Sequence, residues 1–139
     1  MFLQVKIGFF RHVQGVCDLS GMKMKESYGL DTDPLTDYVF SCGQTEAFAA
    51  TVFAIIDRGD EVLLFDPAYV TYETSISLAG GVPVYVPLDP PNWSLNMDKF
   101  MRSFTTRTKD VVLNSPHNPI GKVFTKEELE ASLLELAAN

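Results

Sequence analysis

A short apolar segment and the asparagine- and proline-rich loop behind it decide how this sequence folds. The two stretches are Asp110-Val111-Val112-Leu113-Asn114 and Ser115-Pro116-His117-Asn118-Pro119-Ile120-Gly121-Lys122. The apolar run predicts a buried strand, and the prolines with the following glycine predict a rigid loop at its end. Two other apolar runs, residues 38–42 and 61–65, are each followed by a turn signal and a helical pattern. This alternation favours an α/β fold, a mostly parallel sheet with helices on both faces.

The rest of the chain repeats this pattern outward from the loop. Helices are predicted over residues 13–28, 45–57, 69–78, 97–104 and from 126 onward, and strands over 38–42, 61–65, 82–86 and 110–114. Pro83 places its strand near an edge or a bend of the sheet. Thr125 and Glu128 have the spacing of a capping box at the start of the last helix. With no internal repeat or linker, residues 13–139 are predicted to form one unit behind a leader of uncertain nature, residues 1–12.

Composition excludes several classes of protein. The chain has 139 residues, with 11 Lys and Arg against 18 Asp and Glu, for a net charge of −7. Nucleic-acid binding needs positive surface, so this balance disfavours it. No apolar run approaches the roughly 20 residues of a membrane span. Cys17 and Cys42 are too few for a disulfide scaffold, so a reducing compartment, the cytoplasm, is predicted.

The two ends of the sequence carry separate expectations. Residues 1–16 contain Lys6, Arg11 and His12 and no acidic residue. This composition is typical of a targeting peptide, which leaves an organelle open, but also of the start of an amphipathic helix or of an artefactual first exon. The other end stops inside a helical pattern without a cap glycine, which suggests a truncated product.

Three predicted strand ends carry polar or aromatic side chains, and ligands of such sheets bind just beyond the carboxyl ends of strands. At the first, Gly43 allows close backbone approach, while the N–H groups of Gln44 and Thr45 and the Thr45 hydroxyl offer donors to a phosphate. An ordinary turn is the alternative. At the second, Tyr69 follows Asp66-Pro67, where its ring either stacks on a planar ligand or joins Tyr72 in the core.

The third strand end carries Asn114, His117 and Asn118. An asparagine offers both a donor and an acceptor without changing charge, which suits a phenolic or carboxylate oxygen. The alternative for Asn118-Pro119 is a plain turn, and His117 is expected to be a structural loop residue rather than a base. The chain has no Gly-x-Gly-x-x-Gly, Walker or Gly-x-Ser-x-Gly motif, and its isolated cysteines and histidines predict no metal site.

Taken together, these segments resemble the large, cofactor-binding domain of a fold type I, class I/II aminotransferase that uses pyridoxal 5'-phosphate. Within that family the chain is most similar to the group of kynurenine aminotransferase, glutamine transaminase K and cysteine-conjugate β-lyase. The resemblance covers residues 11–130 and is strongest in residues 59–62, 66–73, 79–81, 106–109 and 114–124. Its most specific part is Asn-x-Pro-x-Asn-Pro-x-Gly-Lys behind an apolar strand, and Ile120, where many relatives have Thr, departs from it.

The resemblance implies a role for each matching residue. The Gly43-Gln44-Thr45 turn corresponds to the part that holds the cofactor phosphate, and Tyr69 to the aromatic that stacks on the pyridine ring. Asn118 corresponds to the asparagine that binds the phenolic oxygen of the cofactor and helps to orient the substrate carboxylate. Asn114 corresponds to a neighbouring asparagine on the substrate side.

The resemblance also implies an activity, and it implies that the lysine required for this activity is absent from the sequence. The activity is transamination between an amino acid, such as kynurenine or glutamine, and a 2-oxo acid by a homodimer. None of the chain's lysines matches the one that forms the Schiff base with the cofactor, so no catalytic residue is assigned and the 139-residue chain alone is expected to be inactive. A non-catalytic truncated product, an interaction partner of a full-length aminotransferase and an unrelated nucleotide-binding domain remain the alternatives.

Overall fold

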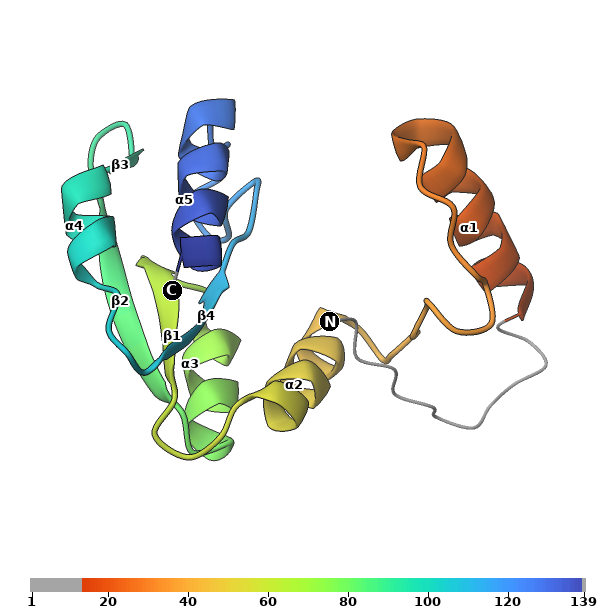
Figure 1. The fold of residues 1–139 in the computed structure, drawn as a ribbon, viewed down its shortest axis with the longest axis horizontal. Coiled ribbons are helices and arrows are strands. Elements are labelled where there is room, and N and C mark those ends of the chain that lie inside the picture. The colour runs from red at the N-terminus through yellow and green to blue at the C-terminus, as the bar shows by residue number, and fades with distance from the viewer. Residues whose placement is uncertain (1–13, 139) are drawn as a thin grey trace. The chain divides into compact units, whose positions relative to one another are not determined.

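Helices and strands alternate along most of the chain in a computed structural model, which describes residues 14–138. The elements are α1 (Gln14–Tyr28), α2 (Gln44–Ile55), β1 (Glu61–Asp66), α3 (Val70–Leu78), β2 (Val82–Asp89), β3 (Ser94–Leu95), α4 (Met97–Arg102), β4 (Thr108–Val112) and α5 (Lys126–Ala138) (Figure 1). They fall into two compact units, of which the first ends at Thr51 and the second begins at Val52. The predicted leader, residues 1–12, lies outside the described residues, and the single domain over 13–139 stays a prediction.

The second unit is built on one sheet with the strand order β3-β2-β1-β4. Strand β1 is parallel to both of its neighbours, with Leu63 opposite Val84 of β2 and Val111 of β4. Strand β3 is antiparallel to β2 and pairs only through two residues at the end of that strand. The prediction of a mostly parallel sheet is therefore confirmed.

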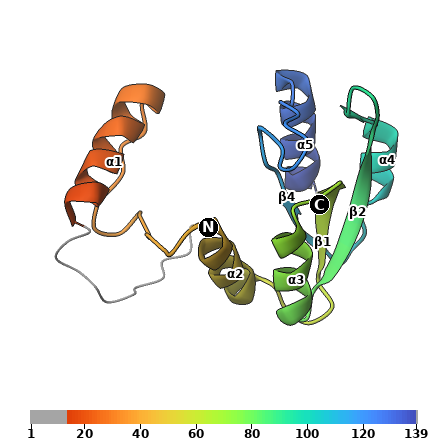
Figure 2. The ribbon, with the colours of Figure 1, turned by 180° about the vertical axis from the view of Figure 1, so that it is seen from behind.

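Strand β1 lies at the centre of the core, and its residues 62–65 are each no more than 1% exposed. Alternate side chains of a strand point to opposite faces of the sheet. Leu63 and Phe65 pack in one cluster with Phe100 of α4, and by this alternation Val62 and Leu64 point to the opposite face. Figure 2 shows α3 on one side of β1, with α4 and α5 on the other, so helices cover both faces as predicted.

The amino end of β1 is closely packed. Glu61 is buried, and its carboxylate accepts hydrogen bonds from the Thr105 hydroxyl (2.6 Å) and from the guanidinium of Arg107. A Cβ added to Gly81, at the entry to β2, would lie 2.7 Å from the Cγ2 atom of Ile56. Only glycine fits at this position without movement of a buried neighbour.

The two outer strands of the sheet differ from each other. Only Leu88 and Asp89 of β2 pair with β3, so the beginning of β2, with Pro83, has no strand on its outer side within residues 14–138. This fits the prediction that Pro83 lies near an edge, because proline offers no N–H to a neighbouring strand. On the opposite side, the sheet of the described residues ends at β4.

The first unit corrects one predicted element. Residues 38–42 do not form a strand, although their composition favours one. Val39 and Phe40 are 45% and 44% exposed, and the Tyr38 hydroxyl instead lies 2.6 Å from the Thr32 hydroxyl. A strand exists only through pairing, and the strand pairs of the described residues do not include this segment. The helix predicted before it is confirmed and ends at Gly29, which has a φ of +69°.

The remaining boundaries shift by a few residues, as helix ends commonly do. Helix α2 begins at Gln44 and ends at Ile55, and α4 ends at Arg102. Within residues 14–138 no helix combines the length and the apolar composition that crossing a membrane requires.

Candidate functional site

The carboxyl ends of β1 and β4 meet at one edge of the sheet, because the two strands are parallel neighbours. Tyr69 comes shortly after β1, and the loop with Asn114 and Asn118 comes directly after β4. His117 joins the two segments, since its Nε2 atom lies 3.0 Å from the carbonyl oxygen of Pro67. The structure thus places the segment of Tyr69 beside the loop of Asn114 and Asn118, although the two segments are far apart in the sequence.

The loop after β4 is held by hydrogen bonds among its own residues. The Asn118 N–H donates to the side-chain oxygen of Asn114 at 2.8 Å, so Asn114 fixes the start of the turn. The His117 N–H donates to the Lys122 carbonyl (2.7 Å), and the Gly121 N–H donates to the His117 carbonyl (2.6 Å). Gly121 has a φ of +71°, a conformation that favours glycine. The Asn118 residue itself is exposed, which leaves its amide open to a ligand.

The far side of this loop is anchored by Glu128 of α5. Its carboxylate accepts hydrogen bonds from the Lys122 ammonium (3.0 Å), the Thr125 N–H (2.9 Å) and the Leu95 N–H of β3 (3.2 Å). Burial disfavours this charge, but the three donors outweigh it and hold the pKa of Glu128 below its ordinary value. The Glu128 N–H in turn donates to the Thr125 hydroxyl at 3.2 Å. The predicted capping box is confirmed.

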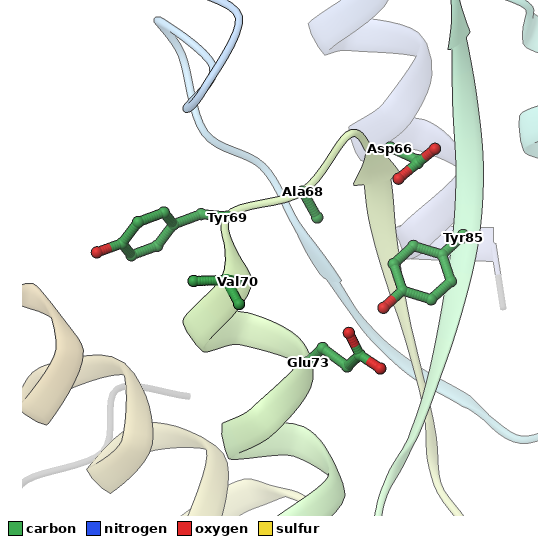
Figure 3. A pocket seen from close by; sticks show the side chains of 6 residues that line it. All are labelled: Asp66, Ala68, Tyr69, Val70, Glu73 and Tyr85. Carbon is green, nitrogen blue, oxygen red and sulfur yellow. The ribbon is translucent and has the colours of Figure 1, made fainter.

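Tyr69 and Tyr72 differ in their surroundings. Tyr72 is buried, with 7% of its surface exposed, whereas Tyr69 is half-buried and precedes the first turn of α3. The two rings meet edge to face, 5.6 Å apart at 77°. Figure 3 shows the Tyr69 ring projecting away from Glu73 and Tyr85. Of the two tyrosines, Tyr72 is therefore the core aromatic, and Tyr69 has the more accessible ring.

A hollow of about 450 Å³ lies between α3 and β2, lined by Asp66, Ala68, Tyr69, Val70, Glu73 and Tyr85 (Figure 3). Glu73 and Tyr85 point toward each other across it. Partial burial and the carboxylate of Glu73 raise the pKa of Tyr85 to about 12, so its phenol is a hydrogen-bond donor at neutral pH. The two carboxylates make this hollow unsuitable for a phosphate. Within residues 14–138, no group of three or more His, Cys, Asp and Glu is arranged to bind a metal ion.

The Gly43-Gln44-Thr45 turn lies in the first unit and begins α2. Gly43 has a φ of +92°, and a Cβ built on it would meet no heavy atom within 4 Å, so the turn is open. The Ser41 hydroxyl and the Gly43 N–H close the turn with bonds of 2.9 and 2.8 Å to carbonyls within it. The first N–H groups of a helix have no acceptor inside it, and here Gln44 and Thr45 carry them. Both residues are exposed, as an anion site requires.

Comparison with known proteins identifies the family. The family model for "Aminotransferase class I and II" matches residues 15–138. The chain belongs to this family. Its members use pyridoxal 5'-phosphate, and the resemblance and the α/β fold predicted from the sequence are confirmed.

Two curated relatives show how much of a family member the chain represents. The probable N-succinyldiaminopimelate aminotransferase DapC of Mycobacterium tuberculosis is 40% identical over 115 residues, which cover 81% of this chain and 29% of the relative. Kynurenine–oxoglutarate transaminase 1 of Homo sapiens is 40% identical over 116 residues, which cover 76% of this chain and 28% of the relative. The chain thus spans less than a third of the length of these aminotransferases.

Solved aminotransferase structures have the same fold over this part. YbdL from Escherichia coli, described as having a methionine aminotransferase function, superposes with a TM-score of 0.86 at 32% identity, covering 91% of this chain and 33% of that one. The N-succinyldiaminopimelate aminotransferase of Mycobacterium tuberculosis superposes with a TM-score of 0.85 at 35% identity, covering 90% of this chain and 33% of that one.

Several contacts around the site were not predicted from the sequence. The bond from His117 to Pro67 and the approach of Glu73 to Tyr85 join residues from different elements, and no local pattern marks them. The sequence indicates part of the contact between Glu128 and Lys122, because the capping-box pattern already assigns Glu128 a position near the start of α5. A charged residue at the start of an apolar strand, Glu61, also signalled that a partner was needed.

Proposed function

We propose that this chain forms the part of an aminotransferase that holds pyridoxal phosphate, and that the whole enzyme transfers an amino group between an amino acid and a 2-oxo acid. The observation that carries the proposal is that the segments of Tyr69 and Asn118 follow neighbouring parallel strands at one edge of the sheet and are joined by the contact between His117 and Pro67. Family membership supports it, because the residues fall in the motifs that the resemblance assigns to the cofactor.

The side chains present fit the chemical groups of this cofactor. The half-buried ring of Tyr69 offers a surface for stacking on a pyridine ring. The exposed amide of Asn118 offers a donor to a phenolic oxygen, and the open Gly43-Gln44-Thr45 turn offers N–H groups to a phosphate. Pyridoxal phosphate, when bound, supplies an electron sink for the carbon that carries the amino group. The residues of this chain bind and orient it.

Asn114 has two proposed roles, because it fixes the backbone of Asn118 and also offers its own amide to the substrate. Its side-chain oxygen is occupied by the Asn118 N–H, so this bond sets where the Asn118 amide stands. The amide nitrogen of Asn114 remains a donor of the kind that a substrate carboxylate accepts. The proposed substrate contact of Asn114 is therefore made through nitrogen and not through oxygen.

The substrate class is broader than any one relative suggests. The relatives are named for N-succinyldiaminopimelate, kynurenine and methionine, which differ in size and charge. We therefore propose an amino acid as donor and a 2-oxo acid as acceptor, with kynurenine and glutamine as the first donors to test. The homodimer and the cytoplasmic location belong to the same proposal.

Cofactor binding by the purified chain tests the proposal. We expect saturable binding of pyridoxal phosphate, followed by the absorbance of the cofactor, and no displacement by ATP or NAD. Asn118→Ala is expected to weaken binding about threefold to tenfold, the effect of one lost hydrogen bond. Lys109→Ala, an exposed residue on β4, is the matched control. Preferential binding of a nucleotide would contradict the proposal.

Transamination by the same chain is a separate test. Because no lysine of residues 1–139 matches the one that attaches the cofactor, we expect no turnover of kynurenine or glutamine with a 2-oxo acid. Turnover by the purified 139-residue chain would show that the assignment of its lysines is wrong. It would leave the binding result untouched.

A further inference from the structure

We propose that His117 is a positioning residue, which holds the segment of Tyr69 and the loop of Asn118 in one fixed arrangement. The inference rests on the proposed function, which assigns both of those residues to the cofactor. It concerns the hydrogen bond and the packing of the His117 ring, and not proton transfer by that ring.

The polar contact of the ring is long-range. His117 is 2% exposed, and its Nε2 atom lies 3.0 Å from the carbonyl oxygen of Pro67, 50 positions earlier in the chain. A carbonyl oxygen only accepts, so Nε2 is the donor in this hydrogen bond. Because Pro67 stands two residues before Tyr69, the bond fixes the main chain from which the tyrosine projects.

The ring is also packed against an aromatic that contacts β1. Phe124 meets His117 edge to face, with centroids 6.0 Å apart at 85°. The same Phe124 lies 5.1 Å from Phe65, near the end of β1. His117 is therefore held between the end of β1, through Pro67, and an aromatic that packs on β1.

The backbone of His117 is equally constrained. Its N–H and its carbonyl bond to Lys122 and Gly121, which close the loop, and Asn118 is the next residue. A displacement of the ring consequently moves both ends of the site. Within the part of the chain that the structure describes, the Nδ1 atom is buried without a hydrogen-bond partner. The Pro67 carbonyl is thus the polar group that orients the ring, and neither ring nitrogen is open to a substrate.

Three substitutions separate the hydrogen bond from the packing. The amide nitrogen of glutamine reaches the position of Nε2, and that of asparagine reaches the position of Nδ1. Leucine fills the space and donates nothing. His117→Gln is expected to keep the contact, and His117→Asn and His117→Leu to lose it. Ile76→Val, a buried change in α3, controls for simple loss of stability.

Amide hydrogen exchange of the full chain tests the inference without any ligand. The Gly121 N–H reports on the loop, and the Tyr72 N–H, bonded to the Tyr69 carbonyl at 3.0 Å, reports on the remote segment. We expect His117→Leu and His117→Asn to speed exchange at both amides about threefold to tenfold, and His117→Gln to restore both. Faster exchange at Gly121 with no change at Tyr72 would overturn the inference.

A second measurement links the contact to the proposed site. Affinity is measured for pyridoxal phosphate, which has a ring and a phosphate, and for inorganic phosphate. His117→Leu is expected to weaken the first about threefold to tenfold and to leave the second unchanged, with rescue by His117→Gln. Ile76→Val, which lowers stability but leaves the contact of His117 in place, is expected to change the two affinities by the same factor. Equal affinity of the unaltered chain for the two ligands would refute the proposed function, whereas exchange at Tyr72 alone decides the inference.

Discussion

The two ends of the sheet differ in the burial of their polar groups. At the amino end, Glu61 is 4% exposed and its carboxylate is bonded to Thr105 and Arg107, and Gly81 leaves no space for a side chain. At the carboxyl end, Asp66 is exposed beside a hollow, and the Asn118 residue is exposed on its loop. The same strand, β1, carries a carboxylate at each end.

The comparison separates the polar groups that stabilise the sheet from the polar groups that remain exposed to solvent. A buried carboxylate costs free energy unless protein groups replace the water it loses, and Glu61 has such groups. Asp66 and Asn118 keep their contact with solvent, which a ligand can replace. Ligands of parallel sheets bind at the carboxyl ends of strands, which is the end of the sheet where Asp66 and Asn118 lie.

The packing at the amino end is tested most strongly by Gly81→Ala. The added methyl group would lie 2.7 Å from the Ile56 Cγ2 atom and 3.0 Å from that of Ile76, so buried side chains must move. We expect the free energy of unfolding to fall by about 1–3 kcal/mol in urea denaturation. Gly15→Ala, with no heavy atom within 4 Å of the new Cβ, is the control and is expected to be neutral or stabilising. Equal effects of the two changes would show that the amino end is loosely packed.

The second test removes the charge at the amino end. The Thr105 hydroxyl and the Arg107 guanidinium, against the opposing effect of burial, hold the pKa of Glu61 below its ordinary value. A lowered pKa in the folded state stabilises the fold above the unfolded value near 4.3, and this stabilisation is lost as pH falls through the folded value. Glu61→Gln is expected to cost roughly 0.5–1.5 kcal/mol at pH 7.

The pH dependence distinguishes this effect from a general loss of packing. The difference in unfolding free energy between the unaltered chain and Glu61→Gln is expected to shrink below about pH 4. Glu130→Gln is the control, because Glu130 forms an exposed pair with Lys126 at 3.6 Å and such pairs contribute little. A difference that stays constant down to pH 2 would contradict the role of the Glu61 charge.

The third test moves to the carboxyl end, where we expect changes in binding rather than in stability. Tyr69→Ala is expected to weaken pyridoxal phosphate binding about threefold to tenfold, because the stacking surface is lost. The change in unfolding free energy is expected to be small, since Tyr69 is half-buried. Tyr69→Phe keeps the ring and is the control. If Tyr69→Ala leaves the affinity for pyridoxal phosphate unaltered, the proposed contact of Tyr69 with the cofactor is wrong.

The smallest expected effect concerns Tyr85 in the hollow. Partial burial, Glu73 and Asp66 raise its pKa to about 12. A raised pKa means that the protonated phenol stabilises the fold below the unfolded value near 10, and that this contribution is lost as pH rises toward the folded value. Glu73→Gln is expected to lower the pKa of Tyr85, measured by tyrosinate absorbance. Glu26→Gln on α1 is the control, and an unshifted titration in Glu73→Gln would place the carboxylate too far away to act.

Local patterns in the sequence predicted the elements that depend on neighbouring residues. Strand β1 and the capping box of Thr125 and Glu128 were found in this way, because each is contained in a few consecutive positions. The prediction of a strand over 38–42 was wrong for the opposite reason, since a strand depends on a partner that its own residues do not reveal. Strand β3, with two residues, is too short to leave a periodic signal.

The candidate site also combines features that local patterns predict with contacts that they do not. Tyr69 and Asn118 were assigned from motifs in consecutive residues, whereas the adjacency of β1 and β4, the strands that they follow, is seen only in the structure. The contact between His117 and Pro67 joins residues 50 positions apart, so the sequence alone predicted a structural role for His117 without its partner. The bonds that Glu128 accepts from Lys122 and from the Leu95 N–H depend in the same way on how α5 and β3 pack.

The strand order β3-β2-β1-β4 also has a consequence for how the chain folds during synthesis. Strands β1 and β2 leave the ribosome first and pair with each other, and β4 adds to the other side of β1 later. Non-local strand pairing is slow, and an unpaired strand edge invites association with other chains. The contacts of Pro67 with His117 and of Phe65 with Phe124 therefore form only after the residues up to Phe124 have been synthesised, and until then the edge of β1 that β4 covers is open to association with other chains.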